Sequence, residues 1–224
     1  MTRLTLFDLD HTLLDGDSDV LWCEFLMGRG LLDRAEFGAR NSAMDHAYRA
    51  GTVSVAEFCA FFVSTLTLKS RAQWQPWRQA FLAEVIAPRL PATAHALVRR
   101  HVDADDLVVL STATNRFITE LTALHLGFEH LIATECETLG EAFTGCTAGT
   151  PNMRDGKVTR LHAWLADRGL ALADCDSTFY SDSMNDLPLL SAVNHPVVVD
   201  PDPRLAAIAA ERGWPVLHLR PQPG

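Results

Sequence analysis

Residues 4–12 read LTLFDLDHT, an apolar run that ends in two carboxylates and a hydroxyl. A short run rich in Leu, Phe and Thr predicts a buried strand of a parallel sheet. Asp8 and Asp10 should then stand at its carboxyl end, where α/β sheets bind ligands, and point to the same side. Two carboxylates aimed at one point repel each other. The pattern therefore indicates a divalent metal between them or a proton held for acid catalysis; the alternative is a polar loop in which Asp caps a helix.

The composition argues against some classes of partner. The chain has 224 residues, enough for one α/β domain or for a core with a smaller insert. Lys and Arg number 19 and Asp and Glu number 28, so the net charge is −9. An acidic protein of this kind is not expected to bind nucleic acid or an anionic membrane. An anionic small molecule is still compatible with this charge, because a metal and a few basic residues can dominate one site.

The cysteines and the apolar runs bear on location. The five cysteines form no CxxC pair and no cluster with histidines, which is typical of reduced thiols and predicts no zinc site. The first residues lack the pattern of a signal peptide, and no apolar run reaches the roughly 20 residues of a membrane helix. We expect a cytoplasmic protein without a membrane partner, either a monomer or a homodimer.

Helical patterns fill a long segment between residues 16 and 88. An ordinary connection between a strand and a helix takes about 2–6 residues, so we expect this segment to be an inserted, all-helical cap domain. Residues 1–15 and 89–224 would then form the core domain. The expected helices are Val20–Met27, Asp33–Ala50, one that starts at Ser54 with Glu57 completing a capping box, and one that starts near Ser70.

Strands and helices alternate in the rest of the chain. Such alternation predicts an α/β fold, a doubly wound parallel sheet with helices on both faces. Between Leu131 and Gly149 the pattern indicates only short strands and turns, and the tail Pro221–Gly224 is expected to be disordered. The other expected elements are the strands Leu107–Ser111, Asp176–Ser181, Pro196–Asp200 and Val216–Leu219, and the helices Thr93–His101, Asn115–Leu126, Lys157–Leu165, one that continues to about Val193, and Arg204–Arg212.

Polar residues recur where the predicted strands end. Ser111 closes the second strand, Asp182 and Asp186 follow the third, and Lys157 begins a helix between them. A serine after a strand is most often a helix cap, and a lysine at a helix start is usually solvated. Together with the acid pair of the first strand, however, they supply what phosphoryl transfer requires: an in-line nucleophile, positive charge near the phosphoryl oxygens and a proton donor for the leaving group.

This combination resembles the haloacid dehalogenase-like superfamily of phosphohydrolases. The resemblance extends over nearly the whole chain, and its first and last motifs are specific. It implies a Rossmann-like core, and the helical insert resembles the C1-type cap of subfamily IB, the branch that contains the phosphoserine phosphatases. The motifs that carry the resemblance are Asp8-x-Asp10-x-Thr12, Ser111-Thr112-Ala113, Lys157 and Ser181-Asp182-Ser183-Met184-Asn185-Asp186.

The resemblance implies four catalytic residues. Asp8 would be the nucleophile and form an aspartyl-phosphate. Asp10 would protonate the leaving oxygen and then activate water. Ser111 would donate a hydrogen bond to a phosphoryl oxygen, and Lys157 would offset the negative charge of nucleophile and phosphate.

The resemblance also implies a metal and a set of binding residues. The expected cofactor is Mg²⁺, which prefers carboxylates, waters and phosphate oxygens. Its protein ligands would be Asp8, the main-chain carbonyl of Asp10, and Asp182, with Asp186 behind them to orient Lys157 or a bound water. The expected substrate-binding residues are Thr12, Asp17, Thr112 and Asn185.

The expected function is that of a Mg²⁺-dependent phosphatase that hydrolyses a small phosphorylated metabolite, with phosphoserine and histidinol phosphate as candidate substrates. Thr112 and Ala113 replace two glycines of the phosphoserine-specific pattern. Asp17 keeps the charge of the cap glutamate that holds an amino group, but Ala60 stands where a cap arginine would hold a carboxylate. Because acids such as Asp17 exclude further negative charge, we expect amino-bearing phosphomonoesters rather than sugar bisphosphates.

Two other classes stay open. A receiver-like signalling module, which accepts a phosphoryl group, also joins acids, a hydroxyl and a lysine at strand ends, but its acids are usually adjacent and the long insert is foreign to it. A hydrolase of the same fold that acts on a non-phosphate substrate, such as a carbon–halogen bond, would need neither Asp10 nor Asp182. His11 is expected to be a bystander, because it points away from the side that Asp8 and Asp10 share.

Overall fold

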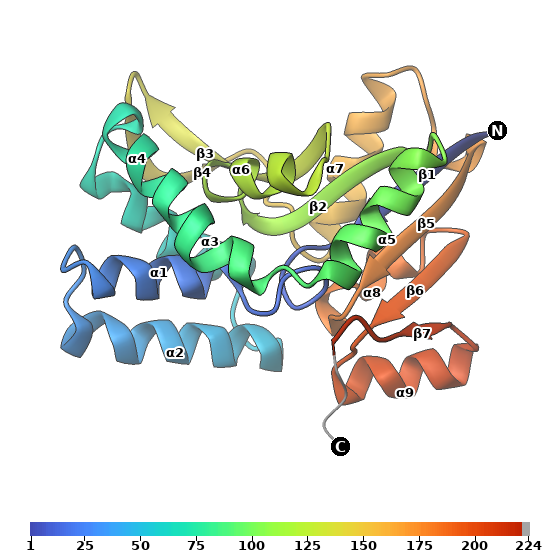
Figure 1. The fold of residues 1–224 in the computed structure, drawn as a ribbon, viewed down its shortest axis with the longest axis horizontal. Coiled ribbons are helices and arrows are strands. Elements are labelled where there is room, and N and C mark those ends of the chain that lie inside the picture. Colours follow the sequence, from blue (N-terminus) through green and yellow to red (C-terminus); the bar gives the residue numbers. More distant parts are fainter. Residues whose placement is uncertain (221–224) are drawn as a thin grey trace.

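The computed structural model describes residues 1–220 and contains a seven-stranded sheet in the order β4-β3-β2-β1-β5-β6-β7 (Figure 1). Neighbouring strands pair in parallel except β3 and β4, which are antiparallel. The strand that precedes the acid pair, β1, is central, so β2 and β5 lie on either side of it. The strands are β1 (Thr2–Phe7), β2 (Leu107–Asn115), β3 (His130–Leu139), β4 (Ala142–Ala148), β5 (Cys175–Ser181), β6 (His195–Val199) and β7 (Val216–Leu217). The expected disorder of Pro221–Gly224 lies outside the described residues.

Helices cover both faces of the sheet. Successive residues of β1 point to opposite faces: Leu6 shares a buried cluster with α7, α8 and α9, whereas Phe7 shares one with α5 and α6. Phe7 also stacks on Tyr180 of β5, with ring centroids 4.7 Å apart. The predicted doubly wound α/β fold is confirmed. The core helices are α5 (Ala92–Asp103), α6 (Arg116–Leu126), α7 (Asp155–Ala166), α8 (Leu187–Leu190) and α9 (Pro203–Arg212), with the short turns η4 (Leu172–Asp174) and η5 (Met184–Asp186).

The described residues between β1 and α5 form helices joined by turns, with α1 and α2 side by side (Figure 1). The predicted capping box of Ser54 and Glu57 is present at the start of α3. At its other end the insert returns to its starting point, because the main-chain N–H of Asp15 donates to the carbonyl of Arg89 at 2.9 Å. The helices are α1 (Ser18–Gly28), α2 (Arg34–Ala50), α3 (Val55–Ser64), η1 (Thr65–Leu68), α4 (Arg71–Phe81), η2 (Leu82–Ile86) and η3 (Ala87–Arg89).

Aromatic side chains hold these helices together. The Trp22 ring lies 5.3 Å from Trp74 and 5.1 Å from Phe81, centroid to centroid, and all three are buried. The indole N–H of Trp74 donates to the carbonyl of Leu66 at 2.8 Å, so its polar atom is satisfied. A further apolar cluster, which includes Phe62 of α3, Ala113 of β2 and Met153, joins the insert to the core.

The hairpin of β3 and β4 is longer than predicted. It has strands of 10 and 7 residues where only short strands were expected, and β4 makes the edge antiparallel rather than parallel. The reason is that α3 and η1 pack on β4 and cover this edge. At Gly145 the backbone has φ 87°, and a Cβ there would lie 3.1 Å from the Thr67 side chain. A glycine at this position permits the close approach of insert and hairpin.

Three predicted boundaries are corrected. β2 runs four residues beyond Ser111, because a register shift between Thr112 and Asn115 lets it continue along β3. α7 begins at Asp155, so Lys157 stands inside the first turn rather than at its start. The helix expected to reach Val193 is α8, which ends at Leu190. Within residues 1–220, none of the helices combines the length and apolarity needed to cross a membrane.

Candidate active site

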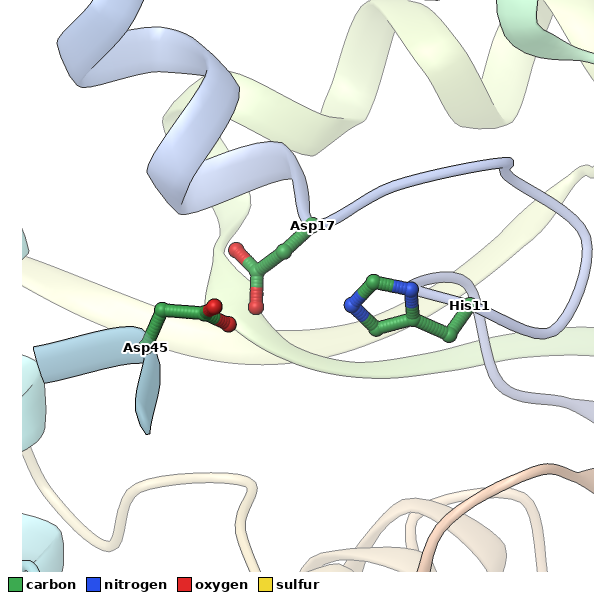
Figure 2. Close-up of side chains that lie close together, drawn as sticks. All are labelled: His11, Asp17 and Asp45. Atoms are coloured by element: carbon green, nitrogen blue, oxygen red, sulfur yellow. The ribbon is translucent and has the colours of Figure 1, made fainter. Parts of the chain in front are cut away.

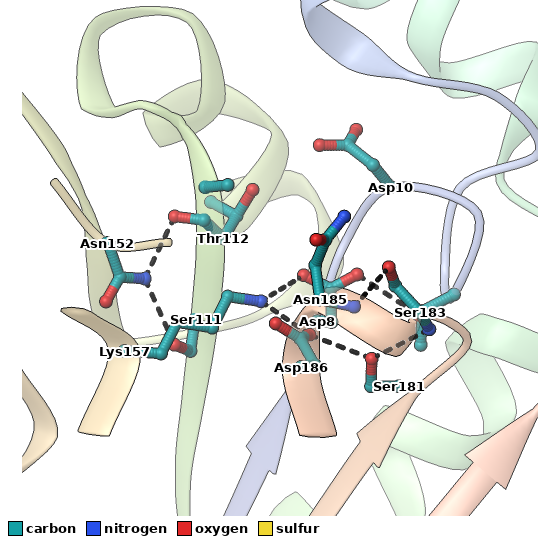
Figure 3. Close-up of polar contacts among 12 residues, drawn as sticks. Asp8, Asp10, Ser111, Thr112, Asn152, Lys157, Ser181, Ser183, Asn185 and Asp186 are labelled. Atoms are coloured by element: carbon teal, nitrogen blue, oxygen red, sulfur yellow. Dashed lines mark hydrogen bonds and ion pairs between the residues drawn. The ribbon is translucent and has the colours of Figure 1, made fainter. Parts of the chain in front are cut away.

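A buried lysine links two carboxylates at the carboxyl ends of β1 and β5 (Figure 3). Lys157 Nζ lies 2.7 Å from Asp8 Oδ1 and 2.7 Å from Asp186 Oδ2. The hydroxyl of Ser181, the last residue of β5, donates to Asp186 at 2.8 Å. The side chain of Lys157 is only 2% exposed, and a lysine is rarely buried unless it is paired. These residues, which were predicted to lie close together, therefore form a closely paired cluster that is buried from water.

The second oxygen of Asp8 faces Asp182 across the hydroxyl of Thr12. Thr12 Oγ1 lies 3.1 Å from Asp8 Oδ2 and 2.9 Å from Asp182 Oδ1. It also accepts a hydrogen bond from the main-chain N–H of Asp182 at 3.0 Å. Carboxylate oxygens from two strand ends thus converge on one polar atom.

Burial is the main influence on the titration of these groups. It raises the pKa of Asp8 to about 7; Lys157 opposes this effect, while Asp186 and Asp10 add to it. It also raises the pKa of Asp182 well above its ordinary value, with the charge of Asp8 as the next cause. Burial disfavours the charge of Lys157, but Asp186 and Asp8 outweigh it and hold the pKa of the ammonium above its usual range. Lys157 thus stays charged, yet its single charge does not neutralise three carboxylates.

The donor set fits a magnesium ion. Asp8 and Asp182 offer hard carboxylate oxygens that converge on one point, and Mg²⁺ takes one or two such ligands together with waters and phosphate oxygens. A divalent ion there would also supply the positive charge that favours the ionised forms of both acids. Asp186 is turned toward Lys157 instead.

Asp10 points away from this cluster, toward the start of the insert (Figure 3). Its Oδ1 accepts a hydrogen bond from the main-chain N–H of Ser18, the first residue of α1, at 2.7 Å. Its Oδ2 accepts one from the hydroxyl of Thr114 in β2 at 2.9 Å. The side chain is only partly buried, and both its oxygens are held by hydrogen bonds.

Ser111 and Thr112 are fixed by an asparagine that the sequence did not single out. Asn152 Nδ2 lies 3.1 Å from Ser111 Oγ, 2.9 Å from the carbonyl of Thr112 and 3.0 Å from that of Ile132. The asparagine is fully buried, and the Thr112 hydroxyl accepts a hydrogen bond from the N–H of Thr114. The roles of Ser111 and Thr112 stay predictions. The side-chain amide of Asn152 fixes both residues, a contact that was not foreseen from the sequence.

Asn185 and Arg154 connect the core to the insert. Arg154 Nε donates to Asn185 Oδ1 at 3.1 Å and its Nη2 donates to the carbonyl of Val53 at 3.2 Å. Asn185 Nδ2 donates to the carbonyl of Tyr48 in α2 at 3.2 Å. Asn185 thus lies at the rim of the site, in contact with the part of the chain expected to contact a leaving group.

A second cluster lies beside Asp10 and consists of His11, Asp17 and Asp45, which point toward one another (Figure 2). One ligand atom from each lies within 4.8 Å of the others. Asp17 is buried and caps α1, since it accepts a hydrogen bond from Val20 N at 2.9 Å. Burial raises the pKa of Asp17 to about 8, and the charges of Asp10 and Asp45 add to the effect.

A cavity of about 190 Å³ adjoins this cluster. It lies between the loop after β1, α2 and the loops after β5 and β6. It is lined by Asp10, His11, Tyr48, Asp182, Ser183, Asp200, Pro201, Asp202 and Arg220, which are polar or charged residues except for Pro201. His11, expected to be a bystander, is part of this second cluster, and its φ of 58° departs from the extended chain that the expectation assumed.

The chain matches the family model described as haloacid dehalogenase-like hydrolase over residues 5–191. The protein belongs to this family. The resemblance drawn from Asp8, Ser111, Lys157 and Asp182 is thereby confirmed, as is the Rossmann-like α/β fold.

Relatives narrow the class of enzyme. The chain is 39% identical to a histidinol-phosphatase of Neisseria meningitidis over 98% of its own length and 100% of the relative's. It is 31% identical to the phosphoserine phosphatase SerB1 of Mycobacterium tuberculosis, over 98% of its own length and 72% of the relative's. A solved structure of a protein of unknown function from Bordetella pertussis Tohama I is 44% identical, with a TM-score of 0.93, and the match covers 98% of this chain and 100% of that one. The predicted enzyme class, a hydrolase of phosphoric monoesters, is confirmed.

Proposed function

We propose that the protein is a Mg²⁺-dependent phosphatase of a small metabolite and acts through an aspartyl-phosphate on Asp8. The main support for the proposal is that Lys157 is buried and paired with Asp8 and Asp186 at the strand ends. This pairing fixes one oxygen of Asp8 and leaves its other oxygen beside Thr12 and Asp182. A carboxylate held in this way is preorganised as a nucleophile.

The chain's own residues have distinct tasks in the proposed reaction. An oxygen of Asp8 forms a bond to phosphorus as the bond between phosphorus and the leaving oxygen breaks, and Asp10 gives that oxygen its proton. Water then attacks phosphorus, Asp10 takes up the proton of the water, and the bond to Asp8 breaks to release inorganic phosphate. Lys157 keeps its charge throughout, because its pKa is held above the usual range. Ser111 would donate a hydrogen bond to a phosphoryl oxygen.

The magnesium ion would be held by Asp8, Asp182 and the main-chain carbonyl of Asp10. When bound, it neutralises negative charge on the phosphoryl oxygens. Asp186 keeps Lys157 beside Asp8 in this arrangement.

We further propose histidinol phosphate as the substrate. The 39% identical relative is named for this activity. The cluster of Asp17, Asp45 and His11 beside the cavity suits the cationic amino group and the imidazole of histidinol. Phosphoserine, the substrate named for the second relative, carries a carboxylate that these acids would repel, and Ala60 offers no cation to hold it.

The division of labour between residues 16–88 and the core follows from the same proposal. Residues 1–15 and 89–220 would bind and transfer the phosphoryl group, while the helical segment 16–88 would act as a cap that surrounds the leaving group. Its contacts to Asp10, Asn185 and Arg154 support this division. A cytoplasmic location and a monomeric or homodimeric state stay predictions.

A substrate panel tests the proposal. Histidinol phosphate, phosphoserine, phosphoethanolamine, a sugar phosphate and p-nitrophenyl phosphate would be supplied to the wild type with Mg²⁺ and with EDTA. We expect hydrolysis only with the metal and the highest kcat/KM for histidinol phosphate. Equal activity after chelation would refute the metal site, and a sugar phosphate as the best substrate would refute selection by charge.

A further inference from the structure

Asp10 is held by two residues that lie outside the motifs named so far. The main-chain N–H of Ser18 fixes its Oδ1 at 2.7 Å, and the hydroxyl of Thr114 fixes its Oδ2 at 2.9 Å. Ser18 begins the first helix of the insert, whereas Thr114 lies in the extension of β2 beyond Ser111. The carboxyl group therefore sits where the insert and the core meet, and each supplies one of its contacts.

The hydroxyl of Thr114 is itself held by contacts to Asp19 and Ser18. It lies 3.1 Å from Asp19 Oδ2 and accepts a hydrogen bond from Ser18 Oγ at 3.1 Å. Asn115 Nδ2 lies 3.5 Å from the other oxygen of Asp19. Ser18, Asp19 and Thr114 are each no more than 3% exposed. Because this network is buried from water, the Thr114 hydroxyl has few other partners and little freedom to turn away from Asp10.

The number of hydrogens on the Thr114 hydroxyl limits which of its neighbours can receive a hydrogen bond from it. A hydroxyl has one hydrogen, so Thr114 can donate to only one of the two carboxyl groups it contacts. Burial raises the pKa of Asp19 well above its ordinary value, and the charges of Asp17 and Asp10 add to this. A neutral Asp19 can donate its own hydrogen to Thr114, which leaves the hydrogen of Thr114 for Asp10.

We propose that Thr114 is a positioning residue for proton transfer by Asp10, and that Asp19 and Ser18 hold it in place. The inference rests on the proposed function, in which Asp10 protonates the leaving oxygen. Proton transfer needs the donor within hydrogen-bond reach of that oxygen. The two fixed contacts set the plane of the Asp10 carboxyl group while each oxygen keeps a further lone pair for the substrate. Thr114 thus acts on the leaving-group step and not on the nucleophile.

This role differs from simple stabilisation of the junction between insert and core. A loose junction would slow every substrate by a similar factor. A misplaced proton donor slows the departure only of leaving groups that need a proton. The ratio kcat/KM reports this step without the later hydrolysis of the aspartyl-phosphate, in which Asp10 serves every substrate alike. Alkyl phosphates such as histidinol phosphate have such leaving groups, whereas p-nitrophenolate departs without help. The ratio of the two kcat/KM values therefore distinguishes a misplaced Asp10 from general damage to the enzyme.

The test compares four enzymes on both substrates: the wild type, Thr114→Val, Thr114→Ser and Asp10→Asn. Valine keeps the shape of threonine and removes the hydroxyl, whereas serine keeps the hydroxyl. We expect Thr114→Val to lower kcat/KM on the alkyl phosphate by about 10–100-fold and on p-nitrophenyl phosphate by less than about threefold. Thr114→Ser should stay within about threefold of wild type on both. Asp10→Asn should show the same selectivity with a larger loss.

The outcomes separate the inference from the function on which it rests. An equal loss of kcat/KM on both substrates in Asp10→Asn would refute Asp10 as the proton donor and the inference with it. Selective loss in Asp10→Asn, together with an equal loss in Thr114→Val, would refute the positioning role alone. If Thr114→Val does not fold, as judged by circular dichroism, Asp19→Ala takes its place. It must then show a loss confined to the alkyl phosphate, and a uniform loss would contradict the proposal.

Discussion

The two ends of the proposed site are built in different ways. At the phosphate end, Lys157, Asp8 and Asp186 come from the core and are buried and paired at 2.7 Å. At the leaving-group end, His11, Asp17 and Asp45 come from the loop after β1, the cap of α1 and the helix α2, and they adjoin a cavity. This contrast fits the proposal that the core carries out the chemistry, whereas the insert selects the substrate.

The largest effect is expected at the phosphate end, from Lys157→Met. The variant leaves two buried carboxylates without their cation, a change that costs about 3–5 kcal/mol in comparable buried pairs. We expect kcat to fall by at least about 10³-fold on histidinol phosphate and on p-nitrophenyl phosphate alike, because charge neutralisation serves every leaving group. Steady-state rates on both substrates check this.

The chain offers a matched control for that variant. Lys69 is the other lysine of the sequence and lies over the rings of Trp74 and Trp77 in the insert. Lys69→Met should retain wild-type rates. A Lys157→Met enzyme that folds and keeps more than about one-tenth of its activity would show that the phosphate end does not depend on this pairing.

A smaller and selective effect is expected at the leaving-group end, from Asp45→Asn. Removal of one charge beside the cavity should lower kcat/KM for histidinol phosphate by about tenfold, of the order of one partly exposed ion pair. The value for p-nitrophenyl phosphate, which has no cationic group, should change by less than about twofold. Glu36→Gln, on the exposed part of α2, is the control. Equal effects on the two substrates would show that Asp45 does not recognise the positive charge of the substrate.

The smallest effect concerns stability rather than rate. The pKa of Asp17 is raised to about 8, so the folded protein binds this proton more tightly than the unfolded chain. Its contribution to stability is present below about pH 4 and is lost as the pH rises through about 8. Asp17→Asn keeps the helix cap without the charge, so its melting temperature should fall less between pH 5 and pH 8. Asp33→Asn, at the exposed cap of α2, should melt like the wild type at both pH values.

A result in the other direction would also be informative. If Asp17→Asn steepened the loss of stability with pH, the carboxyl group would be ionised and paired in the folded protein. The cluster would then already contain its counter-charge, and selection of a cationic substrate by Asp17 would lose its physical basis.

The phosphate end was the more predictable of the two. Asp8, Lys157, Asp182 and Asp186 follow apolar strands or begin a helix, and parallel strands end at one edge of the sheet, so order along the chain sufficed to bring them together. The burial of Lys157 was not foreseen, because a lysine in the first turn of a helix is usually solvated. It is buried here because two carboxylates face it.

The leaving-group end depends on tertiary contacts that the pattern of apolar and polar residues in the sequence does not predict. Asp45 reads as a polar position of an amphipathic helix, and only the packing of α2 brings it to His11 and Asp17. Asn152 and Arg154 lie in a turn before α7, with no repeated pattern to mark them. Thr114 falls between the strand predicted to end at Ser111 and the helix predicted to begin at Asn115, whereas the register shift in β2 keeps it in the strand. The run of small and polar residues that follows this buried strand in the sequence is the one signal that could have indicated it.

The most direct test is to trap the covalent intermediate. Wild type, Asp8→Asn and Asp10→Asn would be mixed with a substrate labelled in its phosphoryl group, quenched in acid within one turnover and mapped by peptide mass spectrometry. The proposed mechanism predicts a labelled acyl phosphate on Asp8 in the wild type, and a longer-lived one in Asp10→Asn with a good leaving group, because Asp10 also activates water. Asp8→Asn should carry none. A label on another residue, or turnover by Asp8→Asn at the wild-type rate, would contradict Asp8 as the nucleophile.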